Sequence, residues 1–282
     1  MSSSIMVNQA NPFVTLPIYR EPSSVAIAGD WHGSRKMALN QIHRASNEGA
    51  CAIIQLGDFG LLKWGEVEIY LNSISDLATE LKLPIFFIDG NHEDFEWIKS
   101  MPLDHKTGLQ SLRPNLWRLP RGARWSWGGV NFAAIGGATS LDRPYRKQGV
   151  SWWPEEEVSS EQIELLKEHA TLYPPVDVLF THDAPLGISV PGIRHRDISS
   201  TSAWGMDELV RAWEHRERLG EVVALLKPLA IFHGHFHRRY SDATGAYGVK
   251  TETNGLGDES NARMNIVIRN ISSFSTKREN DM

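Results

Sequence analysis

The sequence VAIAGDWHG at residues 25–33 holds the pattern from which the fold can be read. Its first four residues are apolar and include β-branched side chains, as expected of a short strand buried on both faces of a sheet. The run stops at Gly29, and Asp30 and His32 follow it. Because alternate residues of an extended chain point to the same side, these two polar side chains can face one ligand. The stretch therefore predicts a buried strand whose C-terminal end carries ligand-binding groups.

Four other stretches repeat this order of an apolar run followed at once by polar residues. They read AIIQLGD at 52–58, IFFIDGNHE at 85–93, VDVLFTHD at 176–183 and LAIFHGHFH at 229–237. In a parallel α/β sheet the C-terminal ends of the strands share one edge, where ligands bind. We therefore expect the five ends to bring carboxylate, amide and imidazole groups into one cleft. This mixture of oxygen and nitrogen ligands is typical of sites for Mn, Fe, Zn or Co.

Segments with helical patterns separate the early strands. Residues 36–47 follow Ser34, which can cap a helix, and residues 66–82 carry apolar side chains at helical spacing. Strand, helix and strand in succession indicate parallel βαβ units. The middle of the chain, residues 116–135, reads instead as three short strands that include a Gly-Gly turn. Further helices are expected at 159–169 and 206–226, and β-like segments at 248–253 and 264–268.

The chain reads as one domain, because it shows no linker, internal repeat or low-complexity tract. We expect a single domain over residues 23–271. A partly ordered N-terminal extension, residues 1–22, precedes it. The polar tail at residues 272–282 is expected to fray.

The composition is ordinary for a soluble globular protein and excludes few functions. The 282 residues carry a formal net charge of -5, which gives no global attraction to nucleic acid or to anionic membranes. The single cysteine, Cys51, allows no intrachain disulfide, as is usual in a reducing cytoplasm. The N-terminus lacks the pattern of a secretory signal, and no apolar stretch approaches the roughly 18 residues of a spanning helix. We expect a cytoplasmic protein without membrane contact, and its oligomeric state stays open.

The order of the polar motifs resembles that of the calcineurin-like metallophosphoesterase superfamily. Asp-x-His, Gly-Asp, Gly-Asn-His-Glu, a single His and Gly-His-x-His follow one another between Val25 and His237. The resemblance implies an α/β protein with a four-layer α/β/β/α sandwich, in which mixed β-sheets are flanked by helices. It also implies a dinuclear metal centre, for which we expect manganese, with iron, zinc or cobalt as alternatives. The ligands implied for the first metal are Asp30, His32 and His237, those for the second are Asn91, His182 and His235, and Asp58 bridges the two.

The same resemblance gives His92 a role beside the substrate phosphate, as general acid or as phosphate donor. Two metal ions clamp the phosphate oxygens and share a water molecule, which loses its proton easily and attacks phosphorus in line as a bridging hydroxide. An imidazole is suited to protonate the leaving alkoxide. Either Glu93 or Asp94 can orient His92 and raise its pKa, and the resemblance favours Asp94.

The substrate is less well defined than the metal site. Ser/Thr phosphoprotein phosphatases of this superfamily carry Asp-Arg-Gly after the second motif, but here Asp58 is followed by Phe-Gly-Leu, which disfavours protein phosphatase activity. The loop at 138–154 offers Arg143 and Arg146 for a phosphate and Tyr145 for stacking on a base, unless it is only a solvated basic loop. We predict hydrolysis of a phosphomonoester or a small phosphodiester. The alternatives are a nuclease acting on DNA or RNA and a non-catalytic scaffold of the same fold.

Overall fold

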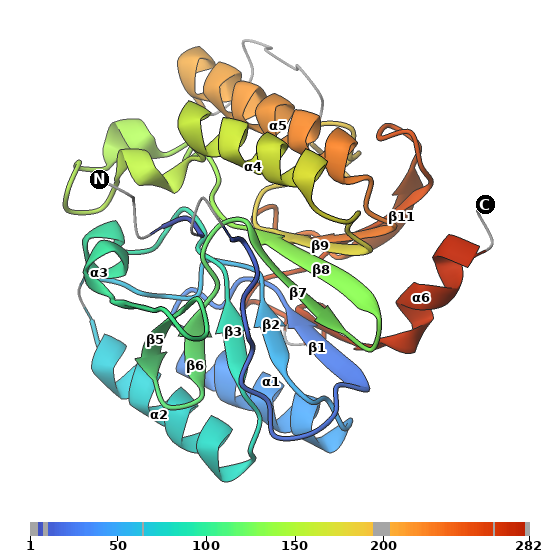
Figure 1. Cartoon of the computed structure of the whole chain (residues 1–282). Helices are drawn as coiled ribbons and strands as arrows, with labels where there is room; N and C mark the ends of the chain where they lie inside the picture. The colour runs from blue at the N-terminus through green and yellow to red at the C-terminus, as the bar shows by residue number, and fades with distance from the viewer. Residues whose placement is uncertain (1–4, 8–10, 64, 194–203, 262, 280–282) are drawn as a thin grey trace.

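A computed structural model describes residues 5–7, 11–63, 65–193, 204–261 and 263–279 (Figure 1). Two mixed β-sheets form its centre. The first has seven strands in the order β13-β1-β2-β3-β6-β5-β4. Its strands are β1 (Ser24–Ala28), β2 (Ile53–Gln55), β3 (Ile85–Phe87), β4 (Leu103–Asp104), β5 (Leu109–Arg113), β6 (Leu116–Arg118) and β13 (Ile266–Asn270).

The second sheet has six strands in the order β11-β12-β10-β9-β8-β7. They are β7 (Ala123–Trp127), β8 (Val130–Ile135), β9 (Val178–Thr181), β10 (Ala230–His233), β11 (Tyr240–Thr244) and β12 (Thr251–Gly255). Strands β1, β2 and β3 run parallel in the first sheet, and β8, β9, β10 and β12 run parallel in the second. The two sheets therefore each present a set of C-terminal strand ends.

Helices cover the outer face of each sheet, as Figure 1 shows. Helices α1 (Arg35–Asn47) and α2 (Val67–Glu80) lie on the first sheet, and α4 (Ser160–Leu172) and α5 (Met206–Leu226) lie on the second. This arrangement confirms the predicted four-layer α/β/β/α sandwich. Among the described residues, no helix is long and apolar enough to cross a membrane.

The space between the sheets is filled by inward-facing side chains of both. Phe132 of β8 and Phe180 of β9 stack with their ring centroids 6.0 Å apart, and Trp125 of β7 stacks on Phe132 at 5.4 Å. All three side chains are buried. Because every buried strand uses one face for this layer and the other for its helices, the strands read as continuous apolar runs in the sequence.

The ends of the chain pack onto the sandwich more closely than their composition suggests. In the N-terminal extension Ile5 is buried, and the backbone N–H of Val14 donates to the carbonyl of Arg124 at 2.9 Å. The polar tail forms helix α6 (Ser272–Glu279), which buries Phe274 between the sheets' apolar side chains. Burial of this side chain contributes about 1.5–3 kcal/mol toward holding the segment on the sandwich.

A buried ion cluster lies just before the Gly-Asn-His-Glu motif. The Asp89 carboxylate accepts hydrogen bonds from Arg118 and from Arg121, whose Nε lies 2.8 Å from Oδ2, and all three side chains are fully buried. Burial alone would raise the pKa of Asp89, but the two guanidinium groups outweigh it and hold this pKa below its usual value. The cluster fixes the backbone from which Asn91 and His92 project.

The substitution Asp89→Asn should destabilise the protein by about 3–5 kcal/mol, because it leaves two buried guanidinium groups without a counter-charge. Thermal or urea unfolding would measure this loss. Asp76→Asn is a suitable control, since Asp76 is exposed on α2. Equal stability of the two variants would show that the buried cluster contributes little.

Candidate metal centre

Two groups of side chains gather where the C-terminal ends of the strands meet. Asp30, His32 and His237 form the first group, and Asp58, His182 and His235 form the second. Within each group the potential ligand atoms lie within 4.8 Å of one another. The structure thus brings together six of the residues that the sequence predicts as ligands, and the seventh, Asn91, contacts His182.

The ligand-bearing segments come from both sheets. The first sheet supplies Asp30 and His32 after β1, Asp58 after β2 and Asn91 after β3, and the second supplies His182 after β9 and His235 and His237 after β10. The sequence predicts that five strand ends share one cleft, but it does not show that they are divided between two sheets. Each group contains residues from both sheets.

In the first group the ring nitrogens and carboxylate oxygens point toward a common centre. His237 Nε2 lies 3.1 Å from Asp30 Oδ2 and 3.1 Å from His32 Nε2. Asp30 is buried, whereas the His237 side chain is 42% exposed, so this side of the centre is open to solvent. Two imidazoles and one carboxylate in this arrangement fit a divalent transition-metal ion.

In the second group the hydrogen-bond pattern leaves one imidazole nitrogen directed at the centre. His182 Nδ1 lies 2.7 Å from the carbonyl oxygen of Leu56, which can only accept, so Nδ1 carries a proton. His182 Nε2 lies 3.0 Å from Asn91 Oδ1 and 3.5 Å from Asp58 Oδ1. Asp58 is also 3.9 Å from His32 Nδ1 of the first group. Its carboxylate therefore lies between the two groups, where a bridging ligand is needed.

The charges at the centre favour bound cations. Burial would raise the pKa of Asp58, but His182 and His92 outweigh it and hold this pKa well below its usual value. Burial opposes the charged form of His182, yet Asp58 and Asp30 raise the pKa of this imidazole to about 10. A buried carboxylate pair that stabilises protons on imidazole would also stabilise metal ions in their place, with release of the protons.

Four of the ligand candidates have a left-handed backbone. The φ angles are 44° at His32, 49° at Asp58, 64° at His235 and 55° at His237. Such conformations cost non-glycine residues of order 1–3 kcal/mol each and cluster at functional sites. Neighbouring glycines allow close approach. A Cβ at Gly90 would collide with the Asp58 carboxylate.

Comparison with models of known protein families identifies the family of this chain. A family model described as calcineurin-like phosphoesterase matches residues 23–239, well over half of the chain. The chain belongs to this family. A comparison with curated protein sequences finds no significant match.

Solved structures of other proteins resemble this chain at low sequence identity. A dimetal phosphatase from Danio rerio is 12% identical, with a TM-score of 0.53 over 89% of this chain and 93% of that chain. The protein TT1561 of Thermus thermophilus is 14% identical, with a TM-score of 0.49 over 88% of this chain and 99% of that chain. At such identities the likeness concerns the fold alone.

His92 lies at the edge of this metallophosphoesterase centre. Its backbone N–H donates to Asp58 Oδ1 at 2.9 Å, and its ring centroid lies 5.7 Å from that of His32. Burial lowers the pKa of His92; the charge of Asp58 raises it, and that of Arg146 lowers it again. The net shift is downward, opposite to the direction expected from the sequence.

The carboxylates of the two acidic residues after His92 accept hydrogen bonds from backbone N–H groups. Asp94 Oδ1 accepts the N–H groups of Glu96 at 3.0 Å and Trp97 at 3.3 Å, and so caps α3 (Phe95–Ser100). Glu93 accepts the N–H groups of Phe59 and Gly90, both at 2.6 Å. The hydrogen bonds described for Asp94 therefore give it the role of a helix cap, and they do not support the prediction that it orients His92.

The three predicted substrate-binding residues have different surroundings. Arg143 Nε lies 3.1 and 3.0 Å from the two carboxylate oxygens of buried Glu208, and its guanidinium stacks on Trp152, so it fixes the loop to α5. Tyr145 is 82% exposed. Only Arg146 reaches the centre, where it lines a pocket together with His92.

Ser140 and Glu156, which the sequence did not suggest, connect Arg146 to the predicted ligand Asn91. Asn91 Nδ2 donates to Ser140 Oγ at 3.0 Å, and Ser140 in turn donates to Glu156. Arg146 donates to Ser140 Oγ at 2.6 Å and to Glu156 Oε1 at 3.1 Å. Since the amide nitrogen of Asn91 is held in this way, its oxygen faces His182 and the second group.

Asp258 was also missed by sequence reasoning. It follows β12, and its Oδ2 lies 3.0 Å from His237 Nδ1, on the side of the ring away from Asp30. A carboxylate that accepts the second ring N–H of a metal-binding histidine fixes the tautomer and orientation of the ring. Asp258 is therefore placed to orient His237 toward the first group.

The substitution Asp258→Asn should weaken metal binding at the first group by about 10- to 100-fold, because the imidazole loses its anionic partner. Metal titration calorimetry with Mn²⁺ would resolve the weaker site. Asp242→Asn, on an exposed position of β11, is the matched control. Unchanged affinity in Asp258→Asn would rule out this orienting role.

Proposed function

We propose that this protein is a dinuclear, metal-dependent phosphoesterase that hydrolyses a phosphomonoester or a small phosphodiester. The observation that carries the proposal is the pair of three-residue groups with Asp58 between them. Two metal ions held there would supply an activated water for in-line attack and would neutralise charge on the phosphate. We propose manganese as the metal, with iron, zinc or cobalt as alternatives, because the mixed imidazole and carboxylate ligands of both groups suit these ions.

The residues of the chain divide the remaining work. Asp30, His32 and His237 would hold the first ion, and Asn91, His182 and His235 the second, with Asp58 shared. His92 would face the ester oxygen that leaves. Although burial lowers its pKa in the free protein, an anionic phosphoester beside the ring would raise that pKa again and favour the proton-donating form.

The two alternatives are less well supported. A scaffold without turnover would have no need to keep a complete ligand set and an imidazole beside it, and this chain has both. A nuclease would be expected to carry a broad basic surface, whereas the net charge is -5 and Arg143 is paired with Glu208.

A substrate panel with Mn²⁺ tests the proposal. It should contain an aryl phosphomonoester, an aryl phosphodiester, 2′,3′- and 3′,5′-cyclic nucleotides, and single- and double-stranded DNA. We expect turnover of at least one small ester and no cleavage of DNA. Cleavage of DNA alone would support the nuclease, and turnover of none would support the scaffold.

Chelation should abolish hydrolysis, and Mn²⁺ should restore it, because in the proposed mechanism bound metal ions lower the pKa of the attacking water. The measurement is the rate of aryl ester hydrolysis before chelation, in excess chelator and after metal addition, alongside metal content by mass spectrometry. Full activity of metal-free protein would disprove the dinuclear mechanism.

A further inference from the structure

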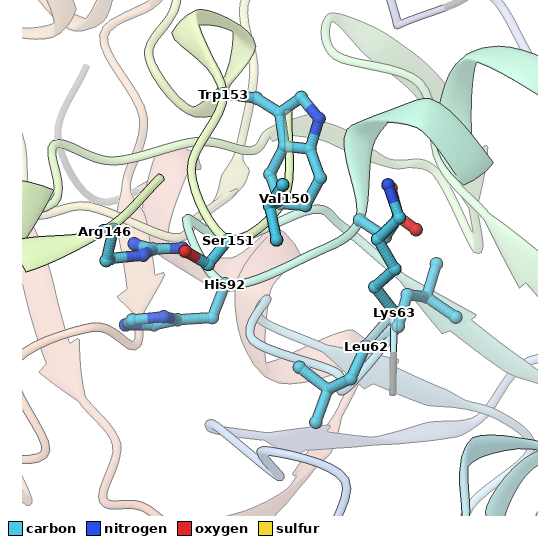
Figure 2. A pocket seen from close by; sticks show the side chains of 9 residues that line it. Leu62, Lys63, His92, Arg146, Val150, Ser151 and Trp153 are labelled. Carbon is cyan, nitrogen blue, oxygen red and sulfur yellow. The ribbon is translucent and has the colours of Figure 1, made fainter. Parts of the chain in front are cut away.

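A pocket opens beside His92, on the side where the loop at 138–154 covers the centre. Its volume is about 190 Å³. Figure 2 shows the side chains of His92 and Arg146 next to each other at one end, Val150 and Trp153 along one wall, and Leu62 opposite them. The remaining lining residues are Leu61, Lys63, Asp94 and Ser151.

The position of the pocket defines which part of a substrate can enter it. In the proposed reaction the phosphate lies at the two metal groups, and His92 faces the ester oxygen that leaves. The carbon atom bonded to that oxygen must then lie within a few ångströms of the His92 ring. The pocket that His92 lines is therefore where the leaving alcohol would be bound.

The polar groups around the pocket already have partners in the protein. Arg146 donates to Ser140, Glu156 and the carbonyl of Asn91. The Asp94 carboxylate caps α3, as described above, and Lys63 Nζ donates to the carbonyl of Gly149 at 3.1 Å. The last bond joins the two segments that line opposite sides of the pocket. Between these polar groups the walls of the pocket are the apolar side chains of Leu61, Leu62, Val150 and Trp153.

The size of the pocket sets an upper limit on what those walls can hold. An engineered protein cavity of roughly 150 Å³ binds benzene, so about 190 Å³ accommodates a single ring with little room to spare. Leu61 and Trp153 are buried, which makes the inner end of the pocket rigid and apolar. A second fused ring would have to displace these side chains or remain outside.

We propose that this pocket binds the leaving group of the substrate and selects an alcohol that carries one largely apolar ring. The inference rests on the proposed phosphoesterase function and refines it. Val150 and Leu62 are the specificity-determining residues, because they line opposite sides of the space that the ring would fill and are less deeply buried than Leu61 and Trp153.

Binding of non-hydrolysable phosphonates to Mn²⁺-loaded protein tests the proposal without relying on turnover. Phenylphosphonate and methylphosphonate share the phosphonate group and differ in the ring. We expect calorimetry to show about 10-fold or tighter binding of phenylphosphonate, because the ring is transferred from water to apolar walls. Naphthylphosphonate, with two fused rings, should bind no more tightly than phenylphosphonate, because the pocket has no room for its second ring.

Two variants fill the pocket from opposite sides. Val150→Trp and Leu62→Trp should each remove the preference for phenylphosphonate over methylphosphonate. Leu172→Trp is the matched control, because Leu172 is a 64% exposed apolar residue at the end of α4. The control should keep the preference.

The outcomes separate this proposal from the function on which it rests. Equal binding of the two phosphonates to the native protein, or an unchanged preference in both pocket variants, would overturn the leaving-group pocket. Failure to bind either phosphonate, with both metal ions present, would instead overturn the phosphoesterase assignment. If only one of the two variants loses the preference for phenylphosphonate, the pocket is still supported. The ring would then pack against the wall that carries the substituted residue.

Discussion

Asp58→Asn should lower the hydrolysis of an aryl phosphate ester by about 100- to 1000-fold. The Asp58 carboxylate lies between the two ligand groups, 3.5 Å from His182 Nε2 and 3.9 Å from His32 Nδ1. The amide of asparagine keeps one oxygen for the backbone N–H groups of Asn91 and His92 but loses the negative charge. Without that charge, two cations held by these adjacent groups would repel each other with less compensation, and we expect the pair not to remain fully occupied.

Metal content and rate should fall together in this variant. Mass spectrometry of the purified protein would report fewer than two bound ions, and steady-state assays in added Mn²⁺ would report the rate. Asp76→Asn makes the same chemical change on the exposed face of α2 and should alter neither quantity. A variant at position 58 that kept both ions and a near-native rate would remove the basis for the bridging role.

His92→Ala should have a comparably large effect on the rate, about 100- to 10,000-fold, but little effect on metal content. The His92 ring is adjacent to the first group without belonging to it, and it lines the leaving-group pocket. Because its role is to protonate the departing oxygen, the loss should be greatest for alkyl esters and smallest for esters of acidic phenols. The dependence of kcat on leaving-group pKa should therefore steepen.

A set of aryl and alkyl phosphates with graded leaving-group pKa provides the measurement. His43→Ala is the control, since His43 is exposed on α1. If the rate falls equally for all esters, His92 binds the phosphate and does not act as the acid. If it does not fall at all, the imidazole has no part in the reaction.

The sequence predicted the ligand-bearing strands well because their signal is local. The run at residues 25–28 is apolar on both faces and stops abruptly before Gly29 and Asp30, so the strand and the candidate ligand are visible together. The division of these strands between two sheets could not be read in this way, because strand pairing depends on contacts between distant segments.

The residues that orient the ligands lacked such a local signal. Asp258 follows Gly257 directly after a strand, as Asp58 follows Gly57, but strand β12 reads TETNG and has no apolar run to mark it. Ser140 belongs to a loop and Glu156 to a short 3-10 helix that follows it, and their importance comes from a hydrogen-bond chain that closes only when this segment folds over Asn91. The sequence offered Arg143 and Arg146 equally as phosphate-binding residues. The structure distinguishes them, because Arg143 forms an ion pair with Glu208 of α5.

Because each ligand group draws on both sheets, the metal ions would act as cross-links between the sheets at the edge where their C-terminal strand ends meet. Asp30 and His32 of the first sheet share a group with His237 of the second, and Asp58 of the first sheet shares one with His182 of the second. When the free concentration of an ion is 100 times its dissociation constant, binding adds about 2.7 kcal/mol to the free energy of unfolding, provided that the ion does not bind the unfolded chain. The centre that performs the chemistry would thus also join the two halves of the molecule, so metal supply in the cell would govern how firmly the protein stays folded as well as how fast it works.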